Sequence, residues 1–96
     1  GNWIDHRATV GSADVQLSSI DRDAIVDDGA TLENSVLLPG ARVCAGATVR
    51  DSIVGPRATV GAGAVLEATC VIGHDVSVPA GSILRGDVRL GGPTNR

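Results

Sequence analysis

Residues 54–89 read VGPRAT VGAGAV LEATCV IGHDVS VPAGSI LRGDVR, which is six hexads in a row. Each hexad begins with an aliphatic residue and carries a small or compact residue at its fifth place. Hexads of this kind are the repeat of a parallel β-helix, in which both positions point inward. The stretch therefore predicts an all-β solenoid.

The same frame extends toward the N-terminus with one-residue deletions, and three hexads or shortened units make one triangular coil. This gives about five coils, at residues 4–19, 20–36, 37–53, 54–71 and 72–89. The first coil needs two short units in succession, VGSAD (10–14) and VQLSS (15–19). The frame then places Asp14 in an inward position, so we expect the first coil to be irregular.

Stacked coils align the first residues of equivalent units about 4.8 Å apart. The predicted inward columns are Ile4, Ile20, Leu37, Val54 and Ile72; Val10, Val26, Val43, Val60 and Val78; and Val15, Leu32, Val49, Leu66 and Leu84. A glycine recurs at one corner of the coils, where positive φ is expected because glycine adopts it without a Cβ clash. These glycines are Gly29, Gly46, Gly63 and Gly81.

The third face provides an independent test of the register. Its outward side chains, coil by coil, are Gln16, Glu33, Arg50, Glu67 and Arg85. Opposite charges on neighbouring strands stabilise their pairing by about 0.2–1 kcal/mol each. The next side chains along this face form a hydroxyl ladder of Ser18, Ser35, Ser52 and Thr69. We interpret this face as a solvated surface with register-fixing ion pairs rather than as a binding groove.

Composition and charge exclude several classes of protein. Trp3 is the single aromatic residue and Met is absent, so the core is built from small aliphatic side chains. Eight Arg, no Lys and a net charge of −3 argue against nucleic-acid binding. No apolar run approaches the roughly 20 residues that span a bilayer, and the N-terminus has no basic stretch followed by an apolar one, so we expect a cytoplasmic protein that does not contact membranes.

The cysteines and histidines are too far apart to act in pairs. Cys44 and Cys70 lie on different faces, so the frame predicts two free thiols, which suits a reducing compartment. His6 and His74 occupy equivalent places four coils apart, about 19 Å along the stack. One metal ion cannot bind both, so we expect no metal site and no cofactor.

Two local resemblances point to enzymes. His74 followed by Asp75 resembles the arrangement in hexapeptide acyltransferases, which use a histidine as general base; this implies a small acyltransferase as an alternative function. The stretch VPAGSILRGDV (78–88) resembles the opening coils of γ-class carbonic anhydrase relatives. Two distant histidines are too few for the zinc ligands that this second resemblance would require.

A third resemblance covers most of the chain. The run LENSVLLPGARVCAGATVRDSIVGPRATVGAGAVLE (32–67) resembles the C-terminal left-handed β-helix of bacterial sugar-1-phosphate nucleotidyltransferases, particularly mannose-1-phosphate guanylyltransferase-like enzymes. The opening NWIDHRATVG (2–11) resembles the point where that domain begins. The resemblance implies left-handed winding and a catalytic domain N-terminal to the β-helix. In that family the β-helix mediates subunit contacts and, in some members, binds an effector.

These observations lead to one main prediction. Residues 1–3 form a junction to an N-terminal nucleotidyltransferase domain of the same polypeptide, 4–90 a left-handed β-helix, and 91–96 a flexible tail. The β-helix serves assembly or regulation in a homo-oligomer and contains no catalytic residue. Trp3 and Ile4, at one open end of the solenoid, are the expected interface residues. Besides this assembly role and the acyltransferase alternative, a third possible function is that of a non-enzymatic solenoid scaffold.

Overall fold

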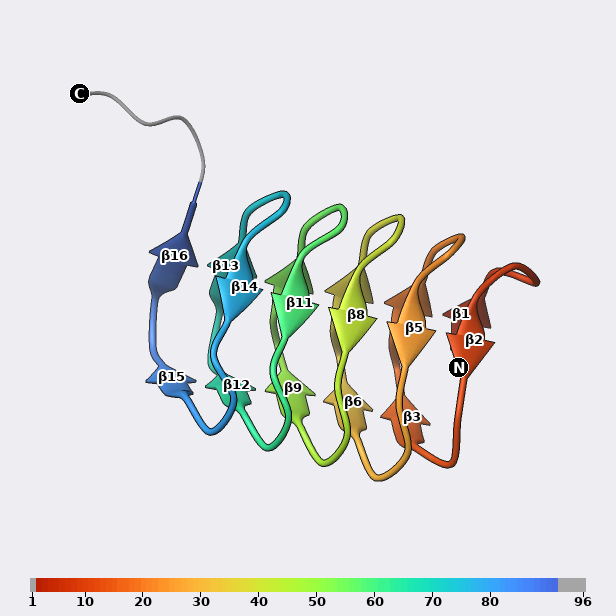
Figure 1. Ribbon diagram of the computed structural model, residues 1–96, viewed down its shortest axis with the longest axis horizontal. Coiled ribbons are helices and arrows are strands. Elements are labelled where there is room, and N and C mark those ends of the chain that lie inside the picture. The colour runs from red at the N-terminus through yellow and green to blue at the C-terminus, as the bar shows by residue number, and fades with distance from the viewer. Residues whose placement is uncertain (1, 92–96) are drawn as a thin grey trace.

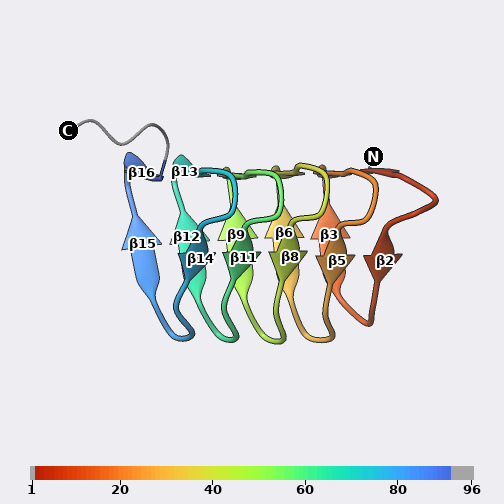
Figure 2. The ribbon, with the colours of Figure 1, turned by 45° about the horizontal axis from the view of Figure 1, so that its top comes forward.

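The computed structural model describes residues 2–91. These residues form a left-handed parallel β-helix and contain no α-helix (Figure 1). Gly1 of the predicted junction and residues 92–96 of the predicted tail lie outside the described residues. Sixteen short strands stack into three parallel sheets. Successive coils follow one another along the long axis, with the N-terminal coil at one end and the C-terminal coil at the other (Figures 1 and 2).

Each sheet takes one strand from every coil. The first sheet contains β1 (Trp3–Ile4), β4 (Ser19–Ile20), β7 (Val36–Leu37), β10 (Ile53–Val54), β13 (Cys70–Ile72) and β16 (Val88–Leu90). The second sheet contains β2 (Thr9–Val10), β5 (Ile25–Val26), β8 (Arg42–Val43), β11 (Thr59–Val60) and β14 (Ser77–Val78). The third sheet contains β3 (Asp14–Gln16), β6 (Thr31–Glu33), β9 (Thr48–Arg50), β12 (Val65–Glu67) and β15 (Ile83–Arg85).

The observed strand register confirms the predicted inward columns. Leu37, for example, pairs with Ile20 on one side and Val54 on the other, and the first column continues from Ile72 to Leu90. The middle coils are fully enclosed, and their column residues are no more than 2% exposed. The alanines and Cys70 fill the space between these columns. Small side chains suffice because each coil encloses so narrow a space.

The charged ladder on the third face is also confirmed. Nη1 of Arg50 lies 2.9 Å from Oε2 of Glu67, and Nε of Arg50 lies 3.3 Å from Oε1 of Glu33. Nε of Arg85 lies 3.0 Å from the other oxygen of Glu67. Glu67 therefore bridges two arginines on neighbouring strands. The four corner glycines have the expected positive φ, between 69° and 77°.

In the first coil, the structure corrects the predicted position of Asp14. The frame placed Asp14 inward, but its side chain is exposed and it pairs with Thr31, whereas Ala13 packs against the core. The unit 10–14 is one residue shorter than a hexad, and this deletion falls in the corner before Ala13 rather than in the strand that follows. Oδ1 of Asp28 accepts a 2.7 Å hydrogen bond from the backbone N–H of Ser12, which holds the shortened corner. The strand pattern is thereby preserved.

The hydroxyl ladder is buried, and this corrects its predicted solvent exposure. Ser18, Ser35 and Ser52 are at most 3% exposed. Each hydroxyl oxygen accepts a hydrogen bond from the backbone N–H one coil later, at 3.1–3.2 Å. The residue after Ser52 in this ladder is Cys70, not Thr69, whose side chain is exposed at the corner. The longer corner of that coil moves the inward position by one residue.

Candidate functional site

The corner that follows β13 contains the histidine considered as a general base. His74 is exposed, and its Nδ1 lies 3.1 Å from Oδ2 of Asp75. Arg57, at the equivalent corner one coil earlier, binds the same carboxylate through Nε to Oδ1 at 2.8 Å and Nη2 to Oδ2 at 2.9 Å. The structure thus brings together His74, Asp75 and Arg57. The sequence frame had not linked Arg57 to the other two.

The electrostatics of this cluster fix the charge of Asp75. Hydrogen bonds from Arg57, and secondarily from His74, lower the pKa of Asp75 to about 2. The same interaction raises the pKa of Arg57. Asp75 is therefore ionised at neutral pH and acts as an acceptor. With its proton on Nδ1, His74 would present Nε2 to solvent as a base.

The other histidine takes no part in this cluster. The side chain of His6 is 87% exposed, and its Nδ1 lies 3.7 Å from Oδ1 of Asp5. Ile4 and Ile72 belong to the same stacked column, so the two histidines stand at equivalent corners about 19 Å apart. Within residues 2–91, no three His, Cys, Asp or Glu side chains come together in a metal-binding group. Cys44 and Cys70 are both free thiols, as predicted.

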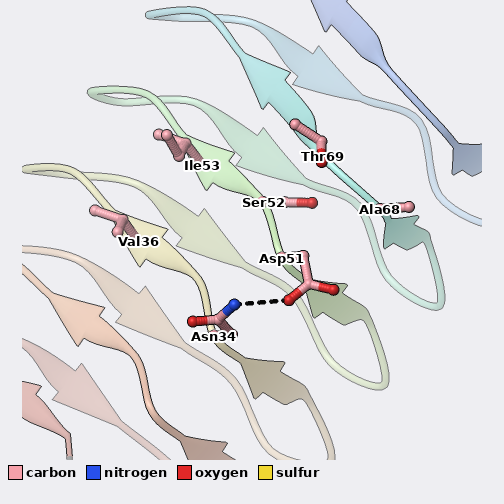
Figure 3. Close-up of a pocket in the computed structure, with 7 residues that line it drawn as sticks. All are labelled: Asn34, Val36, Asp51, Ser52, Ile53, Ala68 and Thr69. Atoms are coloured by element: carbon pink, nitrogen blue, oxygen red, sulfur yellow. Dashed lines mark hydrogen bonds between the residues drawn. The ribbon is translucent and has the colours of Figure 1, made fainter.

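A shallow groove of about 570 Å³ lies between the first sheet and the corner that precedes it (Figure 3). Val36 and Ile53 point outward from neighbouring strands, and the amide of Asn34 donates a 2.8 Å hydrogen bond to Asp51. The lining residues are Asn34, Val36, Asp51, Ser52, Ile53, Ala68 and Thr69. Sequence reasoning missed this groove. The available signal was the change from a five-residue unit at 49–53 to a six-residue unit at 66–71.

The predicted interface residues lie at the N-terminal end of the stack. Trp3 is 55% exposed and Ile4 is 44% exposed. Trp3 pairs with Ser19, so the repeat includes it although the frame began at Ile4. The side chain of Asn2 accepts a 2.9 Å hydrogen bond from the backbone N–H of Ser18 and donates one of 2.7 Å to the carbonyl of Val15.

Comparisons with known proteins place this architecture among its relatives. In fold, the chain is similar to the acetyltransferase domain of PglB from Neisseria gonorrhoeae FA1090, with a TM-score of 0.52 and 21% sequence identity. The match covers 97% of the chain but 56% of that domain. No curated protein matches the chain. Among residues 2–91 there is no helix of the length and apolarity required to cross a membrane.

The family comparison covers nearly the whole chain. The family model described as the GMPPB C-terminal domain matches residues 2–91, the same residues that form the solenoid. This confirms the resemblance to the β-helix of sugar-1-phosphate nucleotidyltransferases that the interleaved five- and six-residue units suggested. The chain therefore belongs to the GMPPB C-terminal domain family.

Proposed function

We propose that this chain is the non-catalytic assembly domain of a cytoplasmic sugar-1-phosphate nucleotidyltransferase. The observation that carries the proposal is the family match over residues 2–91. In this arrangement a catalytic domain of the same polypeptide precedes the β-helix and performs nucleotidyl transfer. The β-helix itself contributes contacts between subunits. Its exposed N-terminal end, with Trp3 and Ile4, faces the catalytic domain or a neighbouring subunit.

Self-association of the chain tests this role. We expect the average mass from light scattering to rise with protein concentration. A strictly monomeric and folded chain at the highest attainable concentration would argue against an assembly role. The coding sequence upstream of Gly1 provides a second test, because a nucleotidyltransferase requires a glycine-rich loop with basic residues that bind the phosphates. A coding sequence with no such loop favours the alternative of a scaffold without an enzymatic partner.

The second candidate function is acyl transfer with His74 as the general base. It is supported by the 3.1 Å contact between His74 and an ionised Asp75, which orients the imidazole. His74→Ala, assayed for acetyl transfer, should abolish activity under this alternative. His6→Ala is the matched control, because His6 stands at the equivalent corner but lies farther from its neighbouring carboxylate, with Nδ1 3.7 Å from Oδ1 of Asp5. Wild-type protein without acetyl transfer, or unchanged activity in His74→Ala, excludes this function.

A further inference from the structure

The three outer faces of the solenoid differ in charge. On the second sheet, Arg42 forms an ion pair with Asp27 at 3.0 Å, and the third sheet carries the ladder centred on Glu67. The outward residues of β7, β10 and β13 on the first sheet are instead Val36, Ile53 and Val71. The residues that follow these three strands are Leu38, Gly55 and Gly73. For three coils the first sheet therefore presents no charged side chain on its outer face.

The exposed aromatic residue belongs to the same outward column. Strand pairing aligns Trp3 with Ser19, Ser19 with Val36, Val36 with Ile53, and Ile53 with Val71. Ile53 is 41% exposed, and the groove beside it is open to solvent (Figure 3). An apolar strip thus runs along the solenoid for about 19 Å from Trp3 to Val71, interrupted by Ser19 and followed in the same column by Arg89 of β16. A strip of this kind marks a contact surface when it is not covered.

We propose that a second copy of this chain packs against the outer face of the first sheet, about a two-fold axis parallel to the solenoid axis. This inference rests on the proposed assembly role and names the surface that performs it. Such an axis makes the facing strands antiparallel and sets each coil opposite the same coil of the partner. The apolar column then packs on itself, as an isologous contact requires. Trp3 lies against the Trp3 side chain of the second copy.

The charges at the two corners beside the sheet favour this orientation. Asp51 precedes β10 and Arg57 follows it, so the rotation brings Asp51 of one copy to Arg57 of the other. Within residues 2–91, Asp51 has a hydrogen bond from Asn34 but no ion pair. Arg57 is 64% exposed and can bind a second carboxylate beside Asp75. An antiparallel pair of solenoids centred on Ile53 would instead oppose the two Asp51 carboxylates.

The size of the face sets the strength of the contact. Five coils are about 24 Å long, and the prism measures 22 × 21 Å across. One face therefore offers roughly 500 Å², below the roughly 800 Å² per partner of a stable interface. The isolated chain should dimerise weakly, and measurements must extend to high concentration. In a longer polypeptide, further contacts would add to this face.

Sedimentation velocity over a wide concentration range tests the proposal with two matched variants. Ile53→Arg changes the proposed face, and Ile83→Arg changes an isoleucine that is 60% exposed on the third sheet. We expect the wild type and Ile83→Arg to associate equally, and Ile53→Arg to weaken the dimer about tenfold or more. Circular dichroism confirms that each variant is folded. Val71→Arg repeats the test if Ile53→Arg does not fold.

The emission of the single tryptophan tests the orientation. Association through the proposed face should shift Trp3 emission to the blue, because the indole leaves water. Emission that does not change while the protein dimerises overturns the arrangement. If the wild type associates and both Ile53→Arg and Val71→Arg associate equally well, the face is wrong while the assembly role stands. If the wild type remains monomeric throughout, the assembly role fails as well.

Discussion

Replacing Ser35 by alanine tests the buried hydroxyl ladder. Oγ of Ser35 accepts a hydrogen bond from the backbone N–H of Ser52 at 3.2 Å and donates one to the carbonyl of Glu33 at 2.9 Å. The substitution removes one oxygen and leaves the buried N–H of Ser52 without an acceptor. An unsatisfied buried group of this kind costs about 1–3 kcal/mol. We expect the free energy of unfolding to fall by that amount.

Urea denaturation followed by circular dichroism measures this loss. The matched control is Ser19→Ala, because Ser19 neighbours the ladder but points outward and its hydroxyl contributes no bond to the ladder. Surface changes of that type stay within about 0.5 kcal/mol. Ser35→Cys should restore part of the stability, since Cys70 occupies the same position one coil beyond Ser52. Equal stabilities for Ser35→Ala and Ser19→Ala would refute a structural role for the hydroxyl.

Three further predictions address the core, a corner and an ion pair. Val60→Asp buries an unpaired carboxylate at a position that is 0% exposed, so no cooperative unfolding transition should remain, whereas Thr59→Asp on the outward side should fold. Gly63→Ala should lower the free energy of unfolding, measured by urea denaturation, by about 1–2 kcal/mol, because φ at this position is +69°. No atom lies within 4 Å of the added Cβ, so the loss would come from the backbone conformation alone, and an unchanged free energy of unfolding would contradict this strain. Arg57→Gln should raise the pKa of Asp75 from about 2 toward 3.8 in a carboxyl NMR titration. Because the folded-state pKa is depressed, the wild type should gain more stability than Arg57→Gln from ionised Asp75 above about pH 4, and should lose that gain as the pH falls toward 2.

The periodic part of the fold could be predicted from the sequence because a β-helix repeats one local rule. Every aliphatic residue that begins a unit occupies an inward column, and the charges of Glu67, Arg50 and Arg85 fit only the observed register. The shortened units were harder to place, since a count from the start of a unit does not show where the deletion falls. In the first coil it falls at the corner before Ala13, so Asp14 lies outside the core.

The candidate sites depend on contacts between coils, which a single frame does not reveal. Arg57 reaches Asp75 because the corners of successive coils stack, although the two residues are 18 positions apart. The groove beside Ile53 likewise lies where a short corner adjoins a longer one. Sequence reasoning therefore located His74 but missed the arginine that binds its neighbouring carboxylate.

The buried ladder shows why corner length and residue type are linked in this chain. A five-residue unit on the third face leaves one residue with positive φ before the next strand, as at Asn34 and Asp51, and the next inward position is then a serine. Its hydroxyl oxygen accepts a hydrogen bond from the backbone N–H of the following coil, so the buried N–H at the tight corner has a protein acceptor. At the N-terminal end the amide of Asn2 replaces the hydroxyl of a preceding coil. The buried serines of this solenoid are therefore placed by the corner that precedes them, and the one-residue deletions on the third face mark where they occur.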